Sequence, residues 1–166
     1  MKDYNNDGRI KVYLAGPFFN DEQNERITFI EELLQELNFD IFSPRQASKI
    51  KPGATRKDME DTFEGNITHI DDADFMLAIL DGNDAGTLFE TGYAYAVKVP
   101  VLYFNETRPQ EKGPNLMLAM SGGLPFVMNS TDIDARTRLR NVLEVMLRDG
   151  LNRMLDTNFN EFKEVE

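Results

Sequence analysis

Short apolar runs alternate with longer amphipathic stretches along most of the chain. The run at residues 74–80, DFMLAIL, is almost continuously apolar, which is typical of a parallel strand buried on both faces. Further runs rich in β-branched or aromatic residues predict strands at residues 10–15, 39–42, 99–104 and 125–128. Apolar residues spaced by three and four predict helices at residues 21–38, 56–70, 86–98, 115–120 and 131–155. Such an alternation predicts a parallel α/β sheet with right-handed crossovers.

Length and composition narrow the class of protein. The 166 residues correspond to about one domain, and we expect residues 1–9 to be a flexible lead-in to a single domain over residues 10–166. Eighteen basic against twenty-nine acidic residues give a net charge of −11, which argues against nucleic acid and anionic membranes as partners. No run spans a bilayer and no signal peptide is recognised, so we expect a cytoplasmic protein. With no cysteine and a single histidine, we expect no metal site and assign acid–base chemistry to carboxylates.

Glu90 is the most informative carboxylate. On the helix predicted for residues 86–98, it shares a face with Tyr93, Ala94 and Val97, whereas Thr87, Thr91 and Lys98 mark the opposite, solvent-facing side. A carboxylate among apolar residues is costly unless it is hydrogen-bonded or functional, and the helix N-terminus nearby favours its ionised form. An ionised carboxylate at a pocket suits nucleophilic attack on an electrophilic carbon. The alternative is a rotated helix that leaves Glu90 solvated.

Ligands of parallel sheets bind outside the carboxyl ends of the strands, where several other candidates lie. Asp84 precedes the helix of Glu90 and either caps it or points into the same cavity, where it could accept hydrogen bonds from sugar hydroxyls. Tyr13, near the end of the first strand, either packs in the core or orients a catalytic carboxylate through its phenol.

The loop at residues 16–20 follows the first strand. It lacks the G-x-G-x-x-G spacing of a dinucleotide site. Phe18 and Phe19 either pack in the core or stack on a planar base. His69 is interpreted as a surface or packing residue.

Five sequence blocks together resemble the nucleoside 2-deoxyribosyltransferase family. They are VYLAGPFFN, FSPRQ, ADFMLAILDG, DAGTLFETGYA and PNLML, and the resemblance runs from about Ile10 to Val127. The pattern D-x-G-T-x-x-E-x-G-x-A with a downstream N-L-M is the most specific part. The resemblance implies a flavodoxin-like fold, that is, a doubly wound five-stranded parallel sheet with helices on both faces. It also implies ping-pong transfer of 2-deoxyribose between nucleobases, without a cofactor.

The resemblance assigns a role to each matching residue. Glu90 matches the nucleophile that forms a deoxyribosyl ester, Tyr13 the tyrosine that positions it, and Asp84 the aspartate that binds the sugar 5′-hydroxyl. Asn115 matches an asparagine that a neighbouring subunit supplies to that hydroxyl, which implies a homo-oligomer, either a dimer or a hexamer. Gln46 resembles a base-contacting glutamine. Further substrate contacts are expected from Gly16 and Phe18. The substrates implied are deoxynucleosides and free nucleobases.

One position departs from the family pattern, and two other functions remain open. Asn66 stands where many members have an aspartate that binds and can protonate the base; an amide cannot supply that proton. The first alternative is an N-glycosidase that hydrolyses nucleoside 5′-monophosphates with the same glutamate. Asp84 disfavours it, because a carboxylate 4 Å from a phosphate charge costs on the order of 4 kcal/mol at an effective dielectric of 20. The second is a non-catalytic nucleoside-binding module.

Overall fold

A parallel sheet forms the centre of the computed structural model, which describes residues 8–47, 50–109 and 113–156. Within those residues the strand order is β2-β1-β3-β4-β5, and every neighbouring pair is parallel. The strands are β1 (Lys11–Ala15), β2 (Asp40–Phe42), β3 (Phe75–Ile79), β4 (Val101–Pro109) and β5 (Gly123–Asn129). This order is that of flavodoxin-like sheets, so the predicted fold class is confirmed.

Seven helices connect or flank the strands in the described part of the chain. They are α1 (Asp21–Glu36), α2 (Pro44–Ala47), α3 (Arg56–Asp72), α4 (Ala85–Ala96), α5 (Leu116–Ser121), α6 (Ala135–Asp149) and α7 (Leu151–Asp156). Side chains cap several N-termini: Asn20 accepts from the Gln23 amide at 2.9 Å, and Thr55 forms a reciprocal capping box with Asp58. Within the described ranges, no helix is long and apolar enough to cross a membrane.

Several element boundaries differ from the sequence predictions. The helix predicted for residues 131–155 begins at Ala135 and divides into α6 and α7, because Gly150 adopts φ +86° and ends the first helix. The predicted loop after residue 44 contains the short helix α2, and β4 continues to Pro109.

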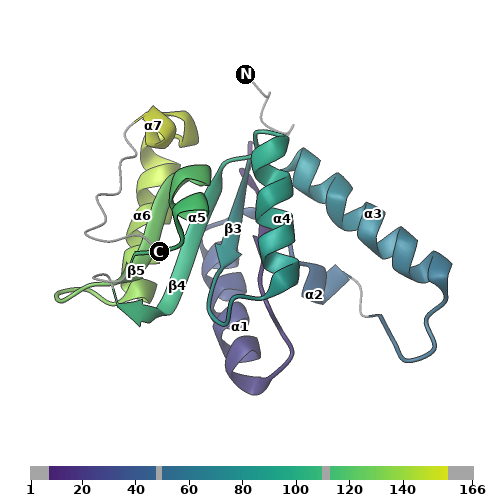
Figure 1. Cartoon of the computed structure of the whole chain (residues 1–166). Coiled ribbons are helices and arrows are strands. Elements are labelled where there is room, and N and C mark those ends of the chain that lie inside the picture. The colour runs from purple at the N-terminus through teal and green to yellow at the C-terminus, as the bar shows by residue number, and fades with distance from the viewer. Residues whose placement is uncertain (1–7, 48–49, 110–112, 157–166) are drawn as a thin grey trace.

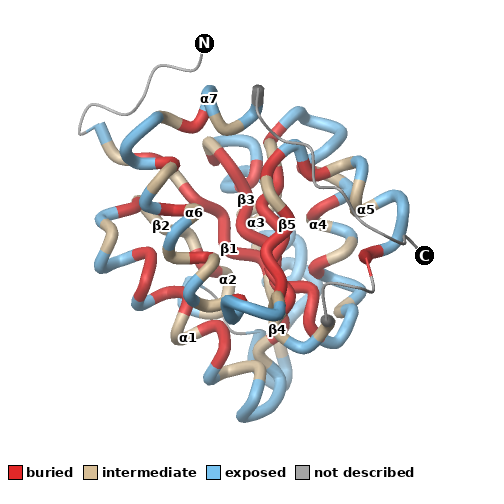
Figure 2. Tube along the Cα trace, turned by 90° about the vertical axis from the view of Figure 1, so that its left-hand side faces the viewer, coloured by how far each residue is buried: buried red, intermediate tan, exposed pale blue. Residues whose placement is uncertain are grey.

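Helices cover both faces of the sheet, and side chains alternate between the two layers along β1, β3 and β4. One layer joins Val12 and Leu14 to apolar residues of α1 and α6, while the other joins Tyr13 to Ile70 of α3 and Ala94 of α4. Every residue of β3 is buried, as predicted for a strand covered on both sides. The trace coloured by burial shows this central buried sheet inside an exposed periphery (Figure 2).

The order of the strands locates the ligand site. The chain leaves β1 toward β2 on one side and later places β3 on the other side of β1, so the crevice at the carboxyl ends of β1 and β3 is the switch point of the sheet. Next to this crevice, α3 projects from the body of the molecule (Figure 1) and buries only Ile70 among its residues. The crevice therefore has a thinly packed helix on one side.

Candidate active site

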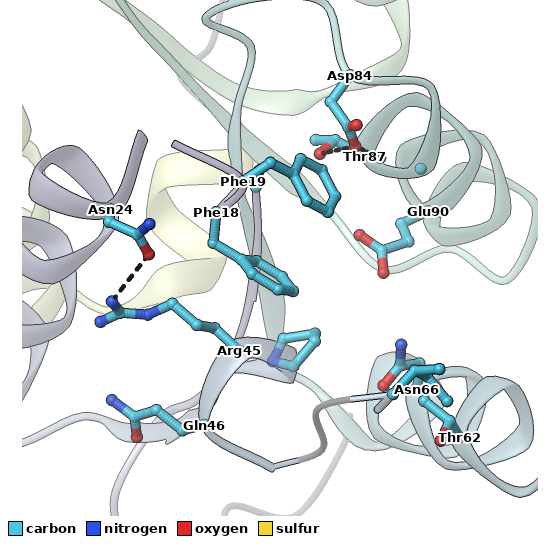
Figure 3. Close-up of a pocket in the computed structure, with 14 residues that line it drawn as sticks. Phe18, Phe19, Asn24, Arg45, Gln46, Thr62, Asn66, Asp84, Thr87 and Glu90 are labelled. Atoms are coloured by element: carbon cyan, nitrogen blue, oxygen red, sulfur yellow. Dashed lines mark hydrogen bonds between the residues drawn. The ribbon is translucent and has the colours of Figure 1, made fainter. Parts of the chain in front are cut away.

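A cavity of about 910 Å³ opens at the switch point, within the usual size range of small-ligand pockets. Figure 3 shows the side chains that surround it. Six of the eight predicted site residues line it, namely Gly16, Phe18, Gln46, Asn66, Asp84 and Glu90. The other two lie elsewhere: Tyr13 contacts Glu90, and Asn115 lines a separate cavity of about 430 Å³.

A phenol–carboxylate pair lies at one wall of the cavity. The Tyr13 hydroxyl on β1 donates a hydrogen bond to Glu90 Oε1 on α4 at 2.6 Å. Tyr13 is completely buried, and burial, together with the neighbouring carboxylate, raises the pKa of its phenol, so the phenol stays protonated and can donate to Glu90. The pair joins residues 77 positions apart in sequence, and it holds Glu90 in one orientation.

The face that α4 turns toward the sheet differs from the prediction. The buried residues of α4 are Thr87, Thr91 and Ala94, whereas Val97, predicted to face inward, is exposed. Each threonine hydroxyl is satisfied locally, because Thr87 bonds Asp84 and Thr91 donates to the Leu88 carbonyl at 2.8 Å. Glu90 is therefore half-buried at the edge of the inward face, and the alternative of a solvated Glu90 is wrong.

Burial sets the protonation of Glu90. Removal from water raises its pKa, the Tyr13 hydrogen bond lowers it, and the negative charge of Asp84 raises it, with a net value of about 7. The sequence predicted that the helix N-terminus favours the ionised form of Glu90, but burial raises the pKa of Glu90 above its usual value. Glu90 lies in the second turn of α4, and the helix dipole fades within the first.

Asp84 caps α4 and also lines the cavity. Its Oδ2 accepts from the Thr87 amide at 2.8 Å and from the Thr87 hydroxyl at 3.0 Å. Gly86 accommodates this cap closely, because a Cβ at that position would lie 3.1 Å from Asp84 Oδ2. The capping interpretation is confirmed, and the same side chain faces the cavity, as Figure 3 shows.

Aromatic side chains form the opposite wall. The rings of Phe18 and Phe19 stack with centroids 5.2 Å apart, and Figure 3 shows them across the cavity from Glu90. Phe18 also packs against the core, whereas Phe19 is 73% exposed. The loop passes close to β3 because residue 16 is glycine: a Cβ there would lie 2.8 Å from Ile79 Cδ1. The wall thus offers a flat apolar surface for a planar group.

Sequence reasoning missed an ion pair at the third wall. Arg45 on α2 lines the cavity, but its guanidinium donates to Glu31, to Thr28 at 3.0 Å and to Asn24 at 3.4 Å. Burial raises the pKa of Glu31, yet hydrogen bonds from Arg45, Ser43 and Gln46 outweigh it and hold the pKa below its usual value. A carboxylate inside the apolar stripe of helix 21–38 was the sequence signal for this pair.

Gln46 and Asn66, the two predicted base contacts, differ in orientation. Gln46 lines the cavity, but Figure 3 shows its amide directed away from Glu90. Asn66 lies on α3 beside Thr62, and both side chains line the cavity. The amide of Asn66 can donate and accept hydrogen bonds there.

Asn115 does not reach the Glu90 cavity of its own chain. It is the exposed N-cap of α5, where its side-chain oxygen accepts from the Met117 amide at 2.9 Å. His69 is exposed and stacks on Phe42, which confirms the surface and packing interpretation. Among the residues that the structure describes, no group of three or more His, Asp or Glu side chains could hold a metal ion.

Fold and site together define a class: flavodoxin-like α/β proteins with a carboxylate cavity beside the switch point of the sheet. Within this class, the nucleoside 2-deoxyribosyltransferase family model matches residues 12–137, and the chain belongs to that family. The structure is similar to a 2-deoxyribosyltransferase from Bacillus psychrosaccharolyticus, with a TM-score of 0.64 and 30% identity over 79% of this chain and 90% of that one.

Two other proteins are similar at lower identity or over a shorter part of the chain. A CMP N-glycosidase from Clostridium botulinum has a TM-score of 0.55 and 13% identity over 78% of this chain and 97% of that one, a level that shows the fold alone. An uncharacterized protein from Ureaplasma parvum serovar 3 is 32% identical over 99 residues, which cover 54% of this chain. The chain spans 62% of the length of that curated relative.

Proposed function

We propose that this protein transfers 2-deoxyribose between nucleobases, with Glu90 as the nucleophile. The observation that carries the proposal is the hydrogen bond from Tyr13 to Glu90 Oε1 at the wall of the cavity. It fixes one carboxylate oxygen and leaves the rest of the group facing the cavity (Figure 3). Family membership supports nucleosides and nucleobases as the small-molecule substrates.

The transfer proceeds in two displacements at the anomeric carbon. A carboxylate oxygen of ionised Glu90 forms a bond to that carbon as the bond to the first base breaks, and the base leaves with the bonding electron pair and takes up a proton from water. The second base then attacks the ester from the opposite face, loses a proton and releases Glu90 as carboxylate. Two inversions give net retention. The negative charges of Glu90 and Asp84 stabilise the oxocarbenium-like transition state.

The wall chemistry favours an unphosphorylated substrate. Asp84 places a carboxylate in the cavity, and the guanidinium of Arg45 is engaged by Glu31, Thr28 and Asn24. A phosphate dianion would therefore meet a like charge and a cation whose charge is already neutralised. Sugar hydroxyls, by contrast, are good donors to Asp84.

The base lies, in this proposal, between the Phe18–Phe19 wall and α3. A planar heterocycle gains from stacking on an aromatic ring. Asn66 contacts its polar edge, and because an amide has no acidic proton, the leaving base is protonated through water.

A base-exchange assay tests the proposal. Deoxyadenosine, deoxyinosine or thymidine is incubated with a second base, and the products are separated by chromatography beside matched reactions with the 5′-monophosphates. Exchange with the nucleosides is expected, together with a peptide containing Glu90 that carries one deoxyribosyl group after acid quenching. Release of base only from monophosphates would indicate the hydrolase, and binding without turnover would indicate a nucleoside-binding module.

The second part of the proposal is a homo-oligomer, dimer or hexamer, in which Asn115 reaches the substrate of a neighbouring subunit. Asn115 and the neighbouring side chains of Leu116, Met117 and Met120 are exposed on α5, an arrangement that suits burial against a second copy. Mixing Glu90→Gln with Asn115→Ala subunits tests it. If the sites are shared in a dimer, random mixing restores about a quarter of the sites, whereas unshared sites gain nothing.

A further inference from the structure

Three aromatic rings form a continuous stack that ends at the Tyr13–Glu90 pair. The ring centroids of His69 on α3 and Phe42 on β2 are 3.5 Å apart, and the two ring planes form an angle of 14°. The ring of Phe42 in turn stacks on Tyr13, 5.5 Å away and at 29°. The Tyr13 hydroxyl then donates to Glu90. Three elements that are distant in sequence are thus connected to one carboxylate.

The outer end of the stack is anchored to the backbone. His69 Nδ1 lies 2.7 Å from the carbonyl oxygen of Gly65, one turn earlier in α3. This contact fixes the rotation of the imidazole and keeps its face on Phe42. Since Ile70 is the only buried residue of α3, the stack is a main connection between that helix and the sheet.

We propose that Phe42 and His69 are positioning residues that hold the Tyr13 phenol against Glu90. A phenol ring pivots about its own attachment, so a ring that is stacked on one face has fewer orientations from which its hydroxyl can leave Glu90. The inference rests on the proposed function, in which Glu90 is the nucleophile. It adds two residues that touch neither the cavity nor Glu90.

Few titratable or charged groups among the described residues lie near Glu90 and could affect its pKa. Tyr13 faces it from β1 and Asp84 from the start of α4, while Arg45 lines the same cavity from α2. The Thr62 and Asn66 side chains that α3 contributes to the cavity carry no charge. At the other end of the stack, His69 shares a small cavity of about 250 Å³ with Lys11, Asp40 and Asp72.

The proposal predicts how substitutions change the titration of Glu90. The Tyr13 hydrogen bond lowers the pKa of Glu90, so loosening it raises that pKa and moves the acidic limb of the kcat profile to higher pH. We expect His69→Ala and Phe42→Leu to move the limb by about half a pH unit and to lower kcat about three- to tenfold, as for the loss of one aromatic pair. KM for the nucleoside should change less than kcat. His69→Phe keeps a stacking ring and should restore most of the activity.

A double-mutant cycle separates positioning from general destabilisation. In a Tyr13→Phe background the hydroxyl is gone. Phe42→Leu and His69→Ala should then cause no further shift of the acidic limb of the kcat profile. Phe63→Leu is the matched control: Phe63 is an exposed α3 aromatic whose ring pairs with Phe89, 6.0 Å away, and not with the stack. It should leave the profile unchanged.

The carboxyl ¹³C titration of Glu90, assigned by comparison with Glu90→Gln, follows the same shift without any turnover. Unchanged titrations in Phe42→Leu and His69→Ala, beside a shifted one in Tyr13→Phe, would overturn the positioning role. An equal shift in the Tyr13→Phe background would overturn it as well. If the wild-type protein transfers no sugar but the Glu90 titrations of the variants shift as expected, the positioning role of the stack is supported and the proposed reaction is contradicted.

Discussion

Two carboxylates beside one cavity, Glu90 in its wall and Glu31 paired with the wall residue Arg45, behave in opposite ways. Glu90 accepts one hydrogen bond from a neutral phenol and lies near the like charge of Asp84, and burial raises its pKa to about 7. Glu31 is buried, but a guanidinium, a hydroxyl and an amide hold its pKa below the usual value. The comparison teaches that the donors around a buried carboxylate decide whether it is a reactive group or a structural one.

The largest expected effect is the loss of base exchange when the reactive carboxylate, Glu90, is replaced. Glu90→Gln keeps the shape and an acceptor for Tyr13 but removes the nucleophile, so base exchange should fall by roughly a thousandfold or more. Initial rates with deoxyinosine and adenine measure it. The circular dichroism spectrum should match the wild type. Near-wild-type rates in this variant would contradict the assignment of Glu90.

Glu31→Gln tests the structural carboxylate, because it removes the ion pair with Arg45. Removing one partner of a buried ion pair leaves Arg45 uncompensated, which should destabilise the fold by about 2–4 kcal/mol in urea denaturation. Glu36→Gln is the matched control on the same helix, because Glu36 pairs with Arg140 at the surface, and such a pair is worth about 0–1 kcal/mol. Equal losses in the two variants would show that burial of the Glu31 pair has no energetic consequence.

Most of the fold could be predicted from sequence, since the alternation of elements is local and strong. The rotation of α4 could not: Thr87 and Thr91 are polar by type, and only their local hydrogen bonds permit burial. Likewise, Glu90 and Tyr13 are 77 positions apart, so the pair came from the family resemblance and not from periodicity. The Arg45–Glu31 pair was missed because its members lie on different elements, and a one-dimensional pattern does not show which charges meet.

The two carboxylates should also give opposite trends of stability with pH. The folded-state pKa of Glu90 is raised from 4.5 to about 7, so the folded state binds the extra proton between these values and loses stability as pH rises through them. Glu90→Gln should therefore be more stable than the wild type at pH 8 by up to about 3 kcal/mol, with the difference vanishing below about pH 4.5. Glu31 has a lowered folded-state pKa, so its contribution is present above its usual pKa and is lost as pH falls through the lowered value. Urea midpoints across pH for both variants measure this, and parallel trends would contradict the comparison.

The smallest expected effect concerns the neighbour that makes Glu90 unlike Glu31. Asp84→Asn preserves a good helix cap but removes the like charge that raises the pKa of Glu90, so the acidic limb of the kcat profile should move to lower pH by a few tenths of a unit. KM for the nucleoside should rise several-fold, because a neutral amide oxygen is a weaker acceptor for the sugar hydroxyl than a carboxylate. Asp134→Asn is the control, since Asp134 caps α6 in the same way, through Thr137, and is remote from the cavity. A limb that stays in place would show that Asp84 acts only as a cap and sugar ligand, and that the donors around Glu31, not the like charge near Glu90, separate the two carboxylates.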